Sequence, residues 1–177
     1  MPPDLLSVCR DKGDTPPGRE VVVQADSSSS GIINSSAVST QCANDSVCVI
    51  PFGTTLQVDT SLSLAALVVK GVVEWTDDTQ VNPSAFMCAG YIAVEGIGKF
   101  EMDVQSKDAF IYIKDNGAVH SKLRSRGFGS VAMNTGDYPI IDINGRDLAR
   151  TWSILSKPLH PGDDKVQLMH NPTFMGW

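Results

Sequence analysis

The chain has 177 residues, of which 42% are hydrophobic and only 19% are charged, and its formal net charge is −6 at pH 7. The length suffices for one domain with a sizeable core, and the composition excludes an intrinsically disordered chain. The acidic balance argues against a nucleic-acid partner, because phosphate groups require a basic face. No apolar run approaches the ~20 residues of a membrane helix, so this segment is expected to make no membrane contact.

Residues 1–46 are predicted to form an N-terminal lead-in and cap that is mostly loop. The start, Met-Pro-Pro-Asp-Leu-Leu, lacks the basic and apolar regions of a signal peptide. Residues 1–20 are polar and rich in Pro and Gly, and a serine run follows at Ser27 to Ser30. Such segments favour loops, so we expect only one strand in this part, at Val21–Val23.

Regular structure is predicted from Val47 onward, and its main feature is a repeated phrase. Leu67–Trp75 consists of a strand, a glycine corner and a second strand, and Ile92–Phe100 repeats this pattern 25 residues later. Ile111–Val119 repeats it after a further 19 residues. A period near 20 to 25 with short strands is typical of a β-solenoid, in which each copy forms one stacked coil. We therefore predict an all-β fold, a short parallel β-solenoid of about four to five coils with an irregular N-terminal cap.

The repeat also predicts which side chains stack. Equivalent positions should form apolar ladders inside the solenoid, which are Leu67, Ile92 and Ile111; Val69, Val94 and Ile113; and Trp75, Phe100 and Val119. The corners should be occupied by glycines, because the chain there needs a positive φ or a close approach to the next coil. The glycines at these corners are Gly71, Gly96, Gly98 and Gly117.

The solenoid domain is assigned to residues 47–133, and residues 134–177 are expected to be continuing coils. The stretch 146–154 is the best candidate for a short helical turn. The apolar end, Phe174–Trp177, looks cut in mid-strand, so we expect the natural protein to continue beyond it.

Four cysteines are present and no Cys-x-x-Cys doublet occurs, which argues against a structural zinc site. The even count suits two disulfides in a secreted protein, and four buried free thiols are the alternative. Turn-forming residues separate Cys42 from Cys48, so their Cα atoms can approach to the ~5.5 Å of a disulfide. Cys9 then pairs with Cys88 and ties the lead-in to the coils.

Two Asn-x-Ser sequons point to the same compartment as the cysteines. They begin at Asn34 and Asn44, in a polar stretch where a glycan has room. Together with the disulfides, they predict a glycoprotein that is extracellular or at the cell surface.

The coil phrases resemble the G-eight domain, an extracellular all-β module named for eight glycines. The resemblance covers about residues 48–133 and rests on Ile50–Asp59, Leu67–Trp75 and Tyr91–Phe100. Downstream, Arg150–Leu155 and Pro161–Val166 are similar to the start of the right-handed β-helix that follows this domain in longer members.

The G-eight family includes fibrocystin, the cell-migration-inducing hyaluronan-binding protein and a transmembrane hyaluronidase. The resemblance therefore implies an extracellular setting and the binding or processing of polysaccharide. It carries over no catalytic residue, because no family motif maps residue by residue onto this chain. The stretch 115–129 also departs from the family, since it is longer and more basic than the last coil of other members.

One dense basic cluster stands out in this acidic chain, formed by His120, Lys122, Arg124 and Arg126. The alternate spacing of the last three is expected to put them on one side of a strand. Three cations in such a row, ~6–7 Å apart, can bind the carboxylates or sulfates of an acidic polysaccharide. The alternative is a solvated edge strand, where Lys and Arg oppose unwanted strand pairing.

The acidic residues are scattered, and solvent-facing strand positions are their simplest interpretation. Glu74 and Glu101 occupy near-equivalent positions on neighbouring coils, a geometry that also suits a glycosidase pair or Ca²⁺. Tyr91, Tyr112 and Tyr138 can stack on sugar rings if they face outward, whereas Trp75 is expected in the core. The three histidines lack a metal-ligand spacing, and no phosphate loop or nucleophile elbow occurs. We therefore predict no metal, no cofactor and no catalytic residue.

Three functions stay open at this point. The first is a polysaccharide-binding or scaffold module of a larger surface or secreted protein. The second is the N-terminal part of a β-helix glycan hydrolase or lyase, and the third is a rigid structural spacer. A binding module should show a flat or shallow basic face. An enzyme should bring two carboxylates, or a carboxylate and a basic residue, together in a groove.

Overall fold

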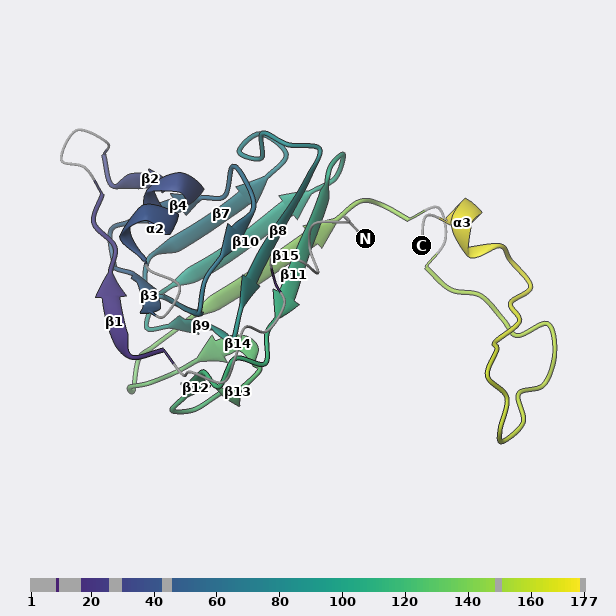
Figure 1. Ribbon diagram of the computed structural model, residues 1–177. Coiled ribbons are helices and arrows are strands. Elements are labelled where there is room, and N and C mark those ends of the chain that lie inside the picture. Colours follow the sequence, from purple (N-terminus) through teal and green to yellow (C-terminus); the bar gives the residue numbers. More distant parts are fainter. Residues whose placement is uncertain (1–8, 10–16, 26–29, 43–45, 149–150, 176–177) are drawn as a thin grey trace. The chain divides into compact units, whose positions relative to one another are not determined.

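The computed structural model describes residues 9, 17–25, 30–42, 46–148 and 151–175, in two compact units that span residues 1–145 and 146–177. The first unit confirms the predicted all-β class, a short parallel β-solenoid (Figure 1). Its chain passes through three parallel sheets in turn and then returns to the first of them one level further along.

Three parallel sheets form the walls of the solenoid. In spatial order, sheet A contains β1 (Arg19–Val22), β3 (Ser46–Ile50), β6 (Ala66–Val69), β9 (Ile92–Glu95) and β14 (Phe128–Val131). Sheet B contains β15 (Ile140–Gly145), β10 (Lys99–Val104), β7 (Val72–Thr76), β4 (Thr55–Gln57) and β2 (Ile32–Asn34). Sheet C contains β11 (Asp108–Ile113), β8 (Ser84–Ala89) and β5 (Leu62–Ser63). A separate antiparallel pair joins β12 (Val119–His120) to β13 (Arg124–Ser125).

Two pairs of the predicted ladders are confirmed in sheet A. Leu67 pairs with Ile92, and Val69 pairs with Val94. Because side chains alternate across a strand, all four point into the solenoid, where none is measurably exposed to solvent. Burying these ladders removes apolar area from water at about 25 cal/mol per Å², which is the main stabilising contribution in a coil of this size.

The rest of the predicted ladders are wrong. Ile111 pairs with Met87 in sheet C, and Ile113 pairs with Ala89 there. Phe100 and Trp75 do not stack, because their register partners are Val73 and Met102, respectively. Val119 is 62% exposed. The physical reason is that the third phrase begins in β11 of sheet C. The chain returns to sheet A only at β14, where Phe128 pairs with Ile92.

The glycine corners behave as expected. Gly96 has a positive φ of 64°, a backbone conformation that favours glycine. Gly71 instead has no room for a side chain, because the carbonyl oxygens of Pro51 and Thr54 occupy the position that a Cβ atom would take. The corner between sheets A and B is therefore packed backbone against backbone.

The N-terminal segment is more regular than predicted. β1 and β2 extend sheets A and B, and the helix α2 (Ser35–Gln41) follows them where the sequence predicts loop. Asn34 caps this helix, because its Oδ1 accepts a hydrogen bond from the N–H of Ala37 at 2.9 Å. The helix contacts β5 of sheet C and buries Val38 in the core, so it closes this end of the solenoid (Figure 1).

The strands of the solenoid run from Arg19 to Gly145, a wider span than the predicted 47–133. β15 pairs with β10 and so continues the coils as far as Gly145. Beyond Gly145 the described residues form no further strand, and they contain one isolated bridge between Leu155 and Leu168 and the helix α3 (Pro172–Met175). No helix forms at the described positions of 146–154.

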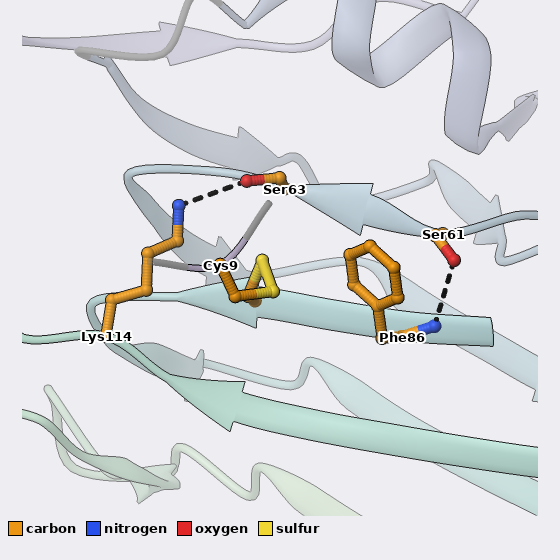
Figure 2. Close-up of a disulfide and its surroundings, with 6 residues drawn as sticks. Cys9, Ser61, Ser63, Phe86 and Lys114 are labelled. Carbon is orange, nitrogen blue, oxygen red and sulfur yellow. Dashed lines mark hydrogen bonds between the residues drawn. A yellow bond between two sulfur atoms is a disulfide. The ribbon is translucent and has the colours of Figure 1, made fainter. Parts of the chain in front are cut away.

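The structure contains the two expected disulfides, Cys9–Cys88 and Cys42–Cys48, each with a Cα–Cα distance of 5.7 Å. The second joins the end of α2 to β3. The first attaches Cys9 to the outer side of sheet C, where Phe86 is a buried neighbour (Figure 2). Around it, Lys114 donates a hydrogen bond from its Nζ to the Oγ of Ser63 at 3.1 Å.

Candidate functional site

The candidate site lies on the outer face of sheet A. Because β9 alternates, Ile92 and Val94 face the core, while Tyr91, Ala93 and Glu95 face outward. The segment 114–127, which we call the flap, carries β12 and β13 and packs over this face through Ala118 and Leu123.

The base of the flap is fixed by Asn116. Its Nδ2 donates a hydrogen bond to the carbonyl of Ala65 at 2.8 Å, and its Oδ1 accepts one from the N–H of Ala118 at 3.2 Å. Asn116 packs directly against Gly90, and a Cβ atom added at Gly90 would overlap the Oδ1 of Asn116. The flap is thus attached to the corner between sheets C and A.

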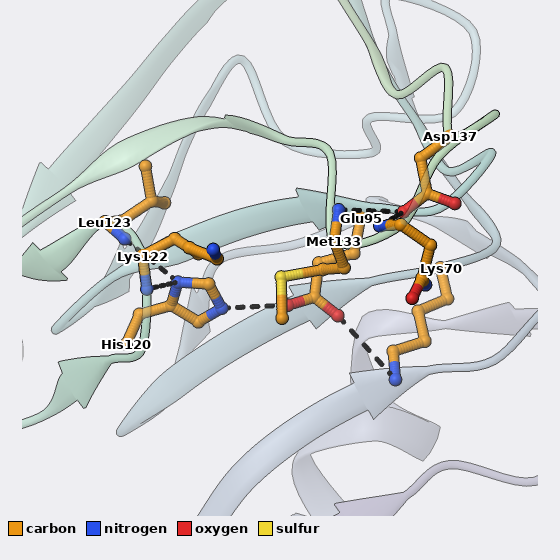
Figure 3. A network of polar contacts seen from close by, with 8 residues as sticks. Lys70, Glu95, His120, Lys122, Leu123, Met133 and Asp137 are labelled. Carbon is orange, nitrogen blue, oxygen red and sulfur yellow. Dashed lines mark hydrogen bonds and ion pairs between the residues drawn. The ribbon is translucent and has the colours of Figure 1, made fainter.

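A charged network centres on Glu95 (Figure 3). His120 Nε2 lies 2.8 Å from Glu95 Oε1, and Lys70 Nζ lies 3.6 Å from Glu95 Oε2. Glu95 and His120 are buried, whereas the Lys70 side chain is half exposed. A buried carboxylate requires such partners, because an unpaired charge in the interior is costly.

The hydrogen bonds of His120 define its tautomer. Its Nδ1 accepts bonds from the backbone N–H groups of Lys122 at 3.2 Å and Leu123 at 3.1 Å. The ring proton therefore resides on Nε2, which donates it to Glu95. His120 links the turn of the flap to β9 and has no ring nitrogen left for a further ligand.

Tyr91 is the second unusual group on this face. It is only 4% exposed, and its ring centroid lies 5.2 Å from that of His120. Burial raises the pKa of Tyr91 to about 12, and the carboxylates of Glu20 and Glu95 add to the shift. The phenol therefore keeps its proton far above neutral pH.

Two hollows share a wall formed by Lys70, Glu95 and Met133. The larger one, which we call the corner groove, has a volume of about 610 Å³ and is also lined by Phe52, Gly96, Ile97, Asn134 and Asp137. The smaller one, the inner hollow, has a volume of about 360 Å³. Its further walls include Glu20, Val49, Val68, Tyr91, Val119 and His120.

The far side of the corner groove is held in place by Asp137. Its Oδ2 accepts hydrogen bonds from the backbone N–H groups of Met133 and Asn134, both at 2.8 Å. The next residue, Tyr138, donates its N–H to the carbonyl of Gly96 at 2.8 Å. The loop 133–138 is therefore attached to the same corner that carries Glu95.

The predicted row of cations does not form. Lys122 lies in a turn, and Arg124 and Arg126 have left-handed backbone angles of φ 66° and 56°. All three side chains are exposed, and Arg126 pairs with Asp115 at 3.0 Å. The predicted alternation is wrong because the chain turns at these residues instead of running straight. His120, the fourth member of the predicted cluster, is buried on Glu95.

The predicted stack of Glu74 and Glu101 is present, since the two residues are register partners in β7 and β10. Each carboxylate has its own partner, because Gln57 Nε2 donates to Glu74 at 3.1 Å and Lys99 Nζ lies 2.6 Å from Glu101. Within the described ranges, no three His, Cys, Asp or Glu side chains are grouped so as to hold a metal ion. Trp75 is buried in the core, as predicted.

Lys70 and Glu95 were not predicted as site residues from the sequence. A local signal exists, however, because both residues immediately precede the corner glycine in successive copies of the same phrase, in Lys70-Gly71 and Glu95-Gly96. Opposite charges at one repeat position lie on neighbouring rungs of a parallel sheet. Of the two sequons, Asn34 is exposed and caps α2, whereas Asn44 lies outside the described residues.

The chain was compared with protein-family models, with curated proteins and with solved structures. None of the three comparisons found a match.

Proposed function

We propose that this protein is an extracellular module that binds polysaccharide in the corner groove. The observation that carries the proposal is the meeting of exposed apolar surface with fixed polar groups in one groove. Phe52 and Ile97 are 75% and 61% exposed, although side chains of this size gain free energy by burial. A sugar ring can cover them with its C–H face while its hydroxyls bond to neighbouring polar groups.

The polar groups of the groove are held before any ligand arrives. His120 and Lys70 hold the carboxylate of Glu95, and Asp137 orders the backbone of the opposite loop. Groups fixed in this way lose little conformational entropy on binding, which favours recognition by a shallow site.

The extracellular setting is supported by the disulfides, since such bonds persist mainly in oxidising compartments. None of the helices in the described part of the chain is long and apolar enough to span a membrane. The sequon at Asn34 lies on the surface, where a glycan has room.

The exposed cations of the flap extend the proposal to acidic polysaccharides. Lys122, Arg124 and Arg126 can each add an exposed ion pair with a carboxylate or sulfate, which contributes at most about 1 kcal/mol. Such contacts weaken in high salt, because the Debye length shrinks to ~3 Å at 1 M. Affinity for an acidic chain therefore depends on several contacts acting together.

A glycan array followed by titration calorimetry tests the proposal. Phe52→Ala is expected to weaken binding of the best ligand by about 3–10-fold, because one aromatic contact is lost. Val81→Ala is the matched control, since Val81 is 71% exposed on a loop that does not line the groove. The proposal fails if no glycan binds, or if Phe52→Ala binds like the native protein.

The flap has its own test. A Lys122→Ala/Arg124→Ala/Arg126→Ala variant is expected to lose affinity for hyaluronan and sulfated glycans only, and the loss should vanish in high salt. If this variant and the native chain bind these glycans equally well at low salt, the three cations lie in a solvated turn and do not contribute to binding.

A second candidate function is glycan cleavage, favoured by the convergence of a carboxylate with basic residues at Glu95, Lys70 and His120. Cleavage produces new chain ends, which are measured as reducing sugar or as shorter oligosaccharides. Loss of such products in Glu95→Gln supports catalysis. Binding without products assigns the groove to recognition alone.

The kinship with the G-eight domain is also a proposal. It rests on the order and spacing of the coil phrases, and no comparison identifies that family. A structure of a G-eight domain with the same three-sheet order and the same flap position supports it, and a different coil order contradicts it.

A further inference from the structure

The hydroxyl of Tyr91 has no hydrogen-bond partner among the residues that the structure describes, although only 4% of this residue is exposed. Every fully enclosed side-chain nitrogen or oxygen in that part of the chain has a partner. Tyr91 is one of the residues that line the inner hollow, so we place its hydroxyl at that space. A buried tyrosine normally finds a partner, so this donor is available to a ligand.

The charges around the inner hollow are unequal. Glu20 and Glu95 contribute two carboxylates, while Lys70 contributes one cation and His120 is neutral as its hydrogen bonds require. Both carboxylates act on Tyr91, since each disfavours an anion at that position. An anionic ligand therefore meets repulsion in the inner hollow, and a hydroxyl or ammonium group meets acceptors.

One wall of the inner hollow is apolar. Val49 and Val68 are register partners on the outer face of sheet A, and both are buried. A flat ring with one apolar face and polar edges matches a valine wall opposite carboxylates and a phenol. The volume of about 360 Å³ lies at the lower end for ligand sites, so it suits one ring.

We propose that the inner hollow binds a single hydroxyl-rich ring that is neutral or carries an amine, and that it rejects uronates. The Tyr91 hydroxyl donates to a ligand oxygen, and Glu20 accepts from a ligand hydroxyl or ammonium. The proposal shares its ligand class with the corner groove and names a separate site. The inner hollow therefore differs in ligand from the flap cations, which suit acidic glycans.

The test uses titration calorimetry and ligand-observed NMR with three probes, the methyl glycosides of glucose, glucosamine and glucuronic acid. The first two are expected to bind the native chain, and the glucuronide at least tenfold more weakly. Tyr91→Phe removes the donor but keeps the ring, and is expected to weaken binding about tenfold. Glu20→Gln, at an exposed site, should remove the preference for glucosamine over glucose.

Phe52→Ala separates the two sites, because Phe52 lines only the corner groove. It is expected to leave unchanged the part of the probe binding that Tyr91→Phe removes. If the native chain binds the probes but no polysaccharide, the proposal for the corner groove is wrong and the proposal for the inner hollow stands. The proposal for the inner hollow is overturned if no probe binds, if the glucuronide binds as well as the others, or if Tyr91→Phe and Glu20→Gln both bind like the native chain.

Discussion

Gln80 accepts the indole N–H of Trp75 at 2.8 Å, and both side chains are almost completely buried. The amide nitrogen of Gln80 donates in turn to the carbonyl of Asn82 at 2.7 Å and of Asp108 at 3.2 Å. One glutamine thus provides the hydrogen-bond acceptor for the indole N–H of Trp75 and connects the loop after β7 to β11 of the next coil.

Replacing Gln80 by Met is expected to destabilise the protein by about 1–3 kcal/mol, because the bulk stays while the Trp75 N–H loses its acceptor. Urea denaturation followed by tryptophan fluorescence measures the loss. Gln105→Met, on the exposed surface, is the control and should change stability by less than about 0.5 kcal/mol. Equal stability of the two variants contradicts the role assigned to Gln80.

The corner at Gly71 provides a second prediction. An added methyl group meets two carbonyl oxygens of the preceding coil, so Gly71→Ala is expected to cost about 1–3 kcal/mol or more through backbone displacement. Gly145→Ala is the matched control, since a Cβ atom there meets no atom within 4 Å. Thermal midpoints of the two variants settle the point, and a normal midpoint for Gly71→Ala is the contradicting result.

The two disulfides should differ in their effect on stability. Cys9–Cys88 spans 79 residues and Cys42–Cys48 spans 6. On the chain-entropy model the long loop contributes about 4–5 kcal/mol and the short one about 2 kcal/mol. Paired Cys→Ala variants measured by denaturation test this order, and a larger loss from the short loop refutes the model for this protein.

The flap depends on His120. In His120→Ala the N–H groups of Lys122 and Leu123 lose their acceptor, so their amide hydrogens should exchange with solvent faster. The unfolding free energy should fall by about 1–3 kcal/mol, because Glu95 also loses its donor inside the protein. Lys122→Ala, which removes only an exposed side chain, should leave both amides protected. Unchanged exchange in His120→Ala contradicts the linking role.

The parts of the fold that were predicted correctly are those encoded by local repetition. Leu67 and Ile92 lie at equal positions of two phrases, and they pair in sheet A as predicted. Ile111 has the same local pattern but belongs to sheet C, because apolar alternation does not say which side of the coil a strand occupies.

The missed helix and the missed site have a non-local origin. α2 contains few apolar residues and is held by distant contacts, such as the bond from the N–H of Ser35 to Asp59 at 3.0 Å. The meeting of Glu95 with His120 depends on the return of the flap over sheet A, which no short pattern encodes. The cations at 122, 124 and 126 were wrongly predicted to lie on one side of a strand. Alternate positions in a sequence do not distinguish a strand from a turn.

The last prediction concerns alkaline pH and Tyr91. Its pKa is about 12 in the folded protein against an ordinary value of 10.0. A raised pKa means that stability is fully present below pH 10 and is lost as the pH rises through 12, because the unfolded chain releases its proton first. The shift corresponds to about 3 kcal/mol. Tyr91→Phe lacks this group, so the stability difference between the two proteins should change over that pH range.

Two measurements check the alkaline prediction for Tyr91. Denaturation of native and Tyr91→Phe proteins between about pH 9 and pH 11.5 follows stability, and absorbance of tyrosinate follows ionisation directly. Glu20→Gln should lower the pH at which Tyr91 ionises, since Glu20 is one cause of the shift, but burial, the largest cause, should keep it above the ordinary value. If all three tyrosines of the native chain ionise together near the ordinary value of 10.0, Tyr91 is not enclosed as the structure has it, and the donor proposed for the inner hollow is lost with it.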